Sequence, residues 1–193
     1  MNTKYKGLTI LFLLLLMSAC GSSEATEPEI DFEVEPFEYM NQDEDYLSLE
    51  DLEGDYWVAN FIFTNCDTVC PPMTANMSRV QEAANEKDLD VRFVSFSVDP
   101  QEDDPDTLKD FANNFNADYS NWDFLTGYEQ NEIESFAANS FKLLVSKVDG
   151  HEQVSHGTSF YIVSPDGVAI NSYSGTSVEE MDEIVSDLEG YLK

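Results

Sequence analysis

The sequence predicts a single α/β domain in which a central β-sheet is covered by helices. Segments rich in aromatic and β-branched residues, typical of strands, alternate with segments whose apolar residues recur at helical spacing. The turn-forming sequence Ser-Pro-Asp-Gly at 164–167 separates the last two strand-like segments and indicates a hairpin near the C-terminus. With 193 residues, of which 42% are hydrophobic, the chain is long enough for one sizeable core and a short extension.

The folded domain is expected to begin with a small hairpin, followed by a buried strand. Two short runs with aromatic residues, Phe37–Met40 and Tyr46–Leu49, bracket the turn-like Asn41-Gln-Asp. The central strand is predicted over about Tyr56 to Thr64, because this run is aromatic and aliphatic enough to be buried. A helix is predicted from about Pro72 to Lys87, where apolar residues share one face.

Strands and helices continue to alternate after this first pair. The patterns predict, in order, a strand at Val91–Val98, a helix at about Thr107–Asn116, a short strand at Trp122–Leu125 and a helix at Tyr128–Ser140. The C-terminal part then predicts extended segments at Phe141–Val148, Val154–Ser155, Phe160–Val163 and Val168–Tyr173, with a turn at Asp149-Gly150. A capping box, Ser177-x-x-Glu180, is expected to open the last helix.

The resulting order, β-α-β-α-β-α-β-β-α, is that of a thioredoxin-like fold. We therefore expect a central mixed β-sheet flanked by helices, with an N-terminal β-hairpin. No internal repeat is present in the sequence.

The N-terminus has the features of a targeting segment. Lys4 and Lys6 precede an apolar run from Leu8 to Met17, and Ser18-Ala19-Cys20 follows. The residues Met17-Ser-Ala-Cys20 resemble a bacterial lipoprotein box, in which Cys20 becomes the lipidated first residue. An ordinary signal peptide or a retained membrane anchor is the alternative.

Three regions are therefore expected: a lipoprotein signal peptide at 1–19, a lipidated Cys20 with a flexible tether over 20–35, and a folded domain over 36–193. This organisation predicts an extracytoplasmic protein that is anchored to the bacterial membrane as a lipoprotein. Removal of residues 1–19 takes away two lysines and no acidic residue, which changes the net charge from −30 to −32.

The chain is strongly acidic, with 39 Asp and Glu residues against 9 Lys and Arg residues. Such a charge argues against nucleic acid as a partner. It would attract cations and basic partners at low salt. Because the acidic residues are spread over the whole chain, we favour a solvated surface suited to a high-salt medium, where repulsion is screened.

Two cysteines stand at the point where the predicted central strand gives way to a helix. Cys66 and Cys70 are separated by three residues, and Pro71 follows directly. Pro71 biases Cys70 away from the α conformation, so Pro71 or Pro72 is expected to be the first helical residue. The positive end of the helix dipole favours thiolates, which bind soft metals and attack disulfides.

The spacing leaves three uses of this cysteine pair open. A redox motif of the thioredoxin type has two intervening residues, not three. A disulfide between Cys66 and Cys70 that only staples the chain would close a short loop and constrain the unfolded chain little. Outside the cytoplasm the pair tends to be oxidised unless it is kept reduced or binds a metal, so we expect a redox site or a metal site.

A third ligand is available in His156, which leads into the strand predicted at Phe160–Val163. In thioredoxin-like oxidoreductases this segment passes beside the active cysteines and carries a proline, whereas here Ser155-His-Gly-Thr-Ser has none. Two thiolates and an imidazole suit Cu(I) and, with an extra ligand, Cu(II) or Zn(II). His151 is the weaker candidate, and Met73 and Met77 are expected to pack in the core rather than to bind metal.

Three stretches together resemble the Sco/SenC family of copper proteins, and the resemblance spans about residues 36–193. They are Phe63-Thr-Asn-Cys66-Asp-Thr-Val-Cys70-Pro71, Val94-Ser-Phe-Ser-Val-Asp99-Pro100 and His156-Gly-Thr-Ser-Phe-Tyr-Ile-Val. The resemblance implies that Cys66, Cys70 and His156 bind one copper ion, and that Asp99 lies near the site without binding the metal. Asp67 within the motif and the acidic surface depart from the family pattern, and neither removes a ligand.

The resemblance implies a membrane-tethered copper chaperone that delivers copper, as Cu(I) or Cu(II), to the dinuclear centre of cytochrome c oxidase. The expected partners are the copper-bearing oxidase subunit, a copper donor protein and the membrane. The site is expected to be exposed, because delivery requires ligand exchange. The alternatives are a thiol–disulfide oxidoreductase that keeps the oxidase-subunit cysteines reduced, and a copper or redox sensor.

Overall fold

The computed structural model describes residues 28–147 and 153–193. Their centre is a six-stranded mixed sheet in the order β1-β10-β9-β4-β5-β6. Its strands are β1 (Phe32–Glu33), β4 (Tyr56–Ile62), β5 (Val91–Ser97), β6 (Trp122–Leu125), β9 (Ser159–Val163) and β10 (Val168–Ser174). The strands β4, β5 and β6 are parallel to one another, whereas β9 pairs antiparallel with both β4 and β10. The predicted fold class, a thioredoxin-like fold with a central mixed sheet, is confirmed.

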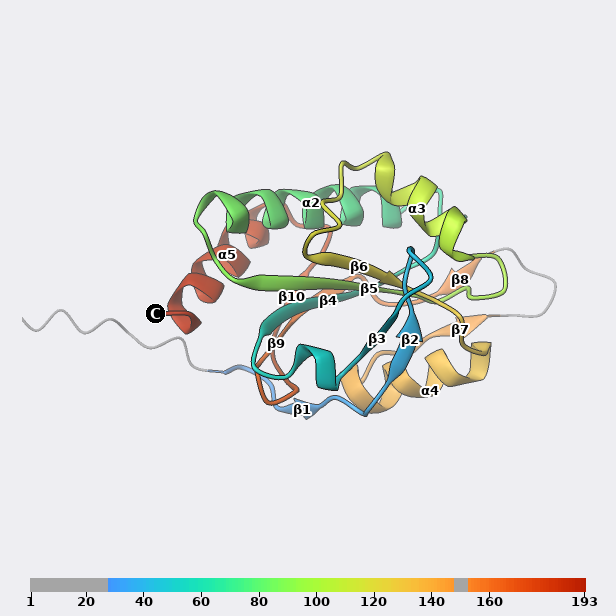
Figure 1. Ribbon diagram of the computed structural model, residues 1–193, viewed down its shortest axis with the longest axis horizontal. Coiled ribbons are helices and arrows are strands. Elements are labelled where there is room, and N and C mark those ends of the chain that lie inside the picture. Colours follow the sequence, from blue (N-terminus) through green and yellow to red (C-terminus); the bar gives the residue numbers. More distant parts are fainter. Residues whose placement is uncertain (1–27, 148–152) are drawn as a thin grey trace, which may run out of the picture.

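Helices cover both faces of this sheet (Figure 1). On one face lie α2 (Cys70–Glu86) and α5 (Glu179–Tyr191), which contact each other, and α3 (Pro105–Asn113) packs beside β6. On the other face lies α4 (Gln130–Phe141). Such burial on both faces explains why β4 and β5 read as nearly continuous apolar runs rather than as alternating ones.

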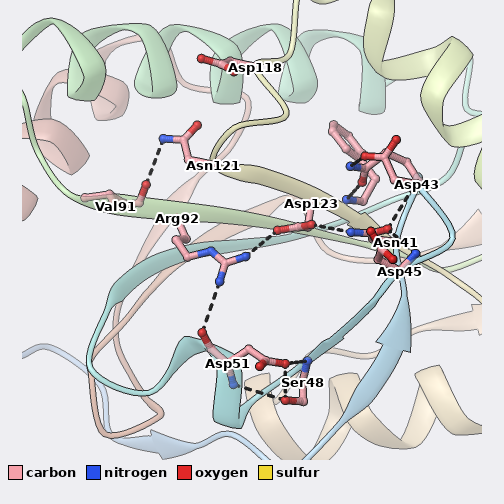
Figure 2. Close-up of polar contacts among 12 residues, drawn as sticks. Asn41, Asp43, Asp45, Ser48, Asp51, Val91, Arg92, Asp118, Asn121 and Asp123 are labelled. Carbon is pink, nitrogen blue, oxygen red and sulfur yellow. Dashed lines mark hydrogen bonds and ion pairs between the residues drawn. The ribbon is translucent and has the colours of Figure 1, made fainter.

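The predicted N-terminal hairpin is present as β2 (Glu38–Met40) and β3 (Tyr46–Ser48), which pair antiparallel and lead into a short 3-10 helix, η1 (Glu50–Leu52). Figure 2 shows how polar side chains attach this hairpin to the sheet. Arg92 of β5 forms an ion pair with Asp123 of β6 at 2.9 Å, and its guanidinium also donates to the Asp51 carbonyl at 3.2 Å. Asn41 donates to the other Asp123 carboxylate oxygen at 2.9 Å.

Several boundaries differ from the sequence prediction for local reasons. The helix α3 begins at Pro105 rather than Thr107, because the Asp104 side chain accepts the Thr107 N–H and caps it. The segment expected to be extended from Phe141 begins instead as the end of α4, which stops at Lys142 in the left-handed conformation. Within the described part of this segment, up to residue 147, only β7 (Ser146–Lys147) forms a strand, and it pairs antiparallel with β8 (Val154–Ser155).

The expected capping box of α5 is half formed. Ser177 Oγ accepts the Glu180 N–H at 3.3 Å, but the Glu180 carboxylate accepts the Ser174 N–H rather than that of Ser177. The strand β1 pairs with β10 at the edge of the sheet. Its residues, Phe32–Glu33, belong to the region 20–35 that was expected to be a flexible tether.

The turn at Asp149-Gly150 lies outside the described residues. Among the residues that are described, no helix has both the length and the apolar character needed to cross a membrane.

Candidate metal centre

The two cysteines lie where β4 passes into α2. Cys70 is itself the first residue of α2, so the expectation that the helix would start at Pro71 or Pro72 is wrong. The prolines fit because they occupy the first turn, where backbone N–H groups have no partner within the helix. The N–H of Cys70 donates instead to Cys66 Sγ at 3.3 Å, which turns the start of the helix toward this sulfur.

The two thiols differ in their tendency to ionise. Burial alone would raise the pKa of Cys66, but hydrogen bonds from the Cys70 side chain and from the N–H groups of Cys70, Thr68 and Val69 lower it. Burial raises the pKa of Cys70, and the hydrogen bond to Cys66 raises it further. Both cysteines are free thiols, and in the metal-free site Cys66 ionises more readily than Cys70.

His156 reaches the cysteines from the segment between β8 and β9. Its Nε2 lies 3.5 Å from Cys70 Sγ, and its Nδ1 lies 2.7 Å from the Gly157 carbonyl oxygen. A carbonyl can only accept, so Nδ1 carries the proton and the Nε2 lone pair faces the sulfur. Burial lowers the pKa of His156, although the bond to Gly157 opposes this effect, and the neutral imidazole that can bind a metal is therefore favoured.

Two contacts hold the histidine segment against the cysteine loop. The Phe63 ring meets the His156 ring edge to face, with the ring centres 5.6 Å apart. The Gln153 side chain donates to the Asn65 carbonyl, next to Cys66, at 3.1 Å. The segment that carries His156 and the loop that carries Cys66 are therefore in direct contact, in addition to being connected through the sheet.

The buried carboxylate of Asp103 holds the start of the loop between β4 and α2, which carries Cys66. It accepts the Thr64 O–H at 2.6 Å, the Thr64 N–H at 3.2 Å and the Ser97 O–H at 2.5 Å. Sequence reasoning missed this residue, because Asp103 stands in a loop with several other acidic residues and no spacing distinguishes it. Burial raises the pKa of Asp103, whereas its hydrogen bonds to Ser97 and Thr64 lower it.

Asp99, which was expected near the site, lies just after β5 and is 1% exposed. It forms an ion pair with Lys147, a residue that the sequence analysis did not single out. Met73 and Met77 are fully buried in the core, as expected. His151 and Cys20 lie outside the described residues.

The structure thus brings Cys70 and His156 into contact and holds Cys66 beside them. Nowhere in the described part of the chain do three His, Cys, Asp or Glu side chains already stand close enough to hold a metal ion. Cys66 and Cys70 are 4% and 0% exposed, so the metal-free site is more buried than expected.

The chain is similar in sequence and in fold to proteins of one family. A curated relative, the SCO1 protein homolog of Bacillus subtilis, is 50% identical over 95% of this chain and 94% of its own length. A solved structure described as a disulfide switch in BsSco, a member of the Sco family of cytochrome c oxidase assembly proteins, is 50% identical and superposes with a TM-score of 0.79. It covers 86% of this chain and 98% of that one.

A further solved structure is that of Bradyrhizobium japonicum ScoI with copper bound. It is 26% identical, covers 83% of this chain and 99% of that one, and gives a TM-score of 0.70. Residues 25–193 match the SCO1/SenC family itself. The protein is therefore a member of the SCO1/SenC family.

Proposed function

We propose that this chain is a copper chaperone that binds one copper ion through Cys66, Cys70 and His156 and delivers it to the dinuclear centre of cytochrome c oxidase. The observation that carries the proposal is the 3.5 Å approach of His156 Nε2 to Cys70 Sγ, with Nδ1 bound to a carbonyl. This arrangement presents an imidazole lone pair and a sulfur to the same point.

The donor set fits copper in both of its common oxidation states. Two thiolates suit Cu(I), and the added imidazole suits Cu(II). Cys66 supplies a sulfur that ionises readily, and copper would take the place of the proton that Cys70 holds in the metal-free protein. Binding should therefore release protons and grow stronger as the pH rises.

The family supports copper as the cargo and the oxidase as the destination. The related Bradyrhizobium japonicum protein has been solved with copper bound, and BsSco belongs to a family of oxidase assembly proteins. Transfer requires that an incoming ligand reach the metal. We expect the receiving oxidase subunit to approach beside His156, because it is less buried than either cysteine.

The proposal includes a place in the cell. The sequence Met17-Ser-Ala-Cys20 supports a lipid on Cys20, and residues that follow it would connect the lipid to the domain outside the cytoplasmic membrane. A chaperone at this position would receive copper from a donor protein and pass it on to a membrane-bound oxidase. Such a protein acts as a carrier and not as an enzyme.

A thiol–disulfide oxidoreductase acting on oxidase-subunit cysteines is the second candidate. The unequal surroundings of the two sulfurs favour it: Cys66 Sγ accepts the Cys70 N–H at 3.3 Å, which lowers its pKa, whereas burial raises the pKa of Cys70, a division suited to an attacking thiolate and a partner thiol. Disulfide exchange requires the two sulfurs but no imidazole ligand, so the dependence of function on His156 separates the two candidates.

The test is copper binding by the purified, reduced full-length chain. We expect one copper ion per chain, loss of tight binding in Cys66→Ser and Cys70→Ser, and weakened Cu(II) binding in His156→Ala. Cu(I) binding should survive in His156→Ala, because two thiolates alone can hold Cu(I) in a linear geometry. Full Cu(II) affinity in His156→Ala would remove that histidine from the site.

A further inference from the structure

We propose that the ion pair between Asp99 and Lys147 is an anchor that fixes the position of His156, and so selectively supports Cu(II) binding. The inference rests on the proposed copper-binding function. It makes both residues positioning residues, since neither is among the candidate copper ligands.

The anchor joins two segments that are far apart in the sequence. Asp99 lies two residues after the end of β5, and Lys147 ends β7. The Lys147 ammonium donates to Asp99 Oδ1, and the Lys147 N–H donates to the Glu134 carboxylate of α4 at 3.1 Å. Lys147 is thus held by its side chain on one element and by its backbone on another.

The buried setting makes this ion pair costly to break. Asp99 is 1% exposed, the Lys147 side chain is 16% exposed, and the second Asp99 oxygen, Oδ2, is buried without a hydrogen-bond partner. Without Lys147 the Asp99 carboxylate would be a buried charge without compensation, which is strongly unfavourable. Lys147 is therefore fixed more firmly than a surface lysine, whose ion pair contributes little.

Lys147 is connected to His156 by the short two-stranded pairing of β7 with β8. In the pairing of β7 with β8, Lys147 stands opposite Val154, and Ser146 stands opposite Ser155, the residue before His156. A two-stranded ladder is marginally stable by itself. The attachment of Lys147 to Asp99 and Glu134 therefore supports this ladder from the β7 side, in addition to the Gln153–Asn65 and Phe63–His156 contacts on the cysteine side.

The expected effect depends on the oxidation state of copper. Cu(II) needs the imidazole, whereas two thiolates suffice for Cu(I). A histidine whose supporting contacts are lost typically costs a metal site about 10- to 100-fold in affinity. Loss of the anchor should therefore weaken Cu(II) binding by about this factor and leave Cu(I) binding unchanged.

The experiment compares Lys147→Met and Asp99→Asn with the unaltered chain, all purified at full length and reduced. Cu(II) affinity is measured by titration with copper sulfate, and Cu(I) affinity by competition with a chromophoric Cu(I) chelator. The electron paramagnetic resonance spectrum of the Cu(II) form reports whether the imidazole remains bound. Asp99→Asn leaves no buried charge behind, because the long Lys147 stem can carry its ammonium to solvent. It therefore carries the test if Lys147→Met does not fold.

Arg92→Met is the matched control. It removes the cation of another partly buried ion pair, Arg92–Asp123, which joins β5 to β6 and does not involve the histidine segment (Figure 2). We expect this control to lower the melting temperature while Cu(II) and Cu(I) affinity and the spectrum stay as in the unaltered chain. The control separates a general loss of fold stability from a displacement of His156.

Different outcomes would contradict the anchor and the proposed copper-binding function. A selective loss of Cu(II) affinity with an altered spectrum in Asp99→Asn or Lys147→Met supports the anchor. Unchanged Cu(II) binding in the folded variants, or equal loss of Cu(I) and Cu(II), overturns it. If the unaltered chain binds neither ion, the proposed copper-binding function itself has failed.

Discussion

At the level of single side chains, the tautomer of His156 decides what the site can bind. The Gly157 carbonyl takes the Nδ1 proton, so Nε2 points its lone pair at Cys70 Sγ. The sequence could single out His156 as a candidate ligand, because an imidazole stands in the segment where related oxidoreductases carry a proline. The sequence could not show which imidazole nitrogen faces the cysteines, because the tautomer depends on the Gly157 carbonyl, whose position is set by folding.

The two thiols should also differ in reactivity. The pKa of Cys66 lies below that of an ordinary thiol and the pKa of Cys70 lies above it. Since the thiolate is the nucleophile, iodoacetamide should alkylate Cys66 first in the reduced, metal-free chain. The pH midpoint of this reaction at Cys66 should lie below that at Cys70.

Mass spectrometry of peptides from a timed alkylation series measures the rate at each cysteine. Cys70→Ala should remove the side-chain hydrogen bond that lowers the Cys66 pKa, and so move the midpoint of Cys66 upward. Faster alkylation of Cys70 than of Cys66 in the unaltered chain would contradict this assignment.

At the level of the elements, strands were predicted more accurately than the attachments between them. The short strand Trp122–Leu125 and the β2–β3 hairpin were found where the patterns placed them. The start of α2 was misplaced, because the bias of Pro71 on its neighbour is only a tendency, and the contact of the Cys70 N–H with Cys66 Sγ outweighs it. Lys147 was overlooked, because its partner Asp99 lies far away in the sequence.

The loop after β5 gives a test of how the cysteine loop is held. Asp103→Asn should destabilise the fold by about 1–3 kcal/mol, because an amide group would face the O–H and N–H donors of Thr64 and the O–H of Ser97. Urea denaturation of the reduced, metal-free chain measures this free energy. Glu102→Gln, an exposed neighbour in the same loop, should change stability by less than about 0.5 kcal/mol. Equal effects of the two substitutions would show that Asp103 is not an anchor.

At the level of the whole molecule, negative charge dominates. The chain carries a net charge of −30, and several of its few basic residues are already engaged in ion pairs, among them Lys87, Lys109 and Lys193. Such an excess of like charge strains the compact state by self-repulsion. Salt screens this repulsion, with a Debye length of about 10 Å at 0.1 M.

The melting temperature should therefore rise when NaCl is added to the purified chain at neutral pH. Differential scanning calorimetry between low salt and molar salt measures it, and an uncharged osmolyte at matched water activity is the control for non-electrostatic effects. A flat melting temperature across this range would mean that the charges are already compensated in the folded protein.

The lipid anchor is tested on the chain as its host processes it. With a lipid on Cys20, the protein should partition into the detergent phase, and Cys20→Ala should leave an unprocessed or released form. Mass spectrometry of the mature N-terminus provides the direct measurement. An unmodified mature N-terminus at another residue would contradict the anchor.

The most direct test of copper delivery is the level of assembled cytochrome c oxidase in cells that carry His156→Ala, compared with Cys66→Ser. Cysteine loss should abolish both copper delivery and thiol reduction, whereas thiol–disulfide exchange needs only the two sulfurs. Copper delivery therefore predicts poor oxidase assembly in His156→Ala at ordinary copper, with partial recovery when copper is added, because mass action offsets a weaker site. Normal assembly in His156→Ala together with failure in Cys66→Ser would contradict copper delivery and favour the reductase.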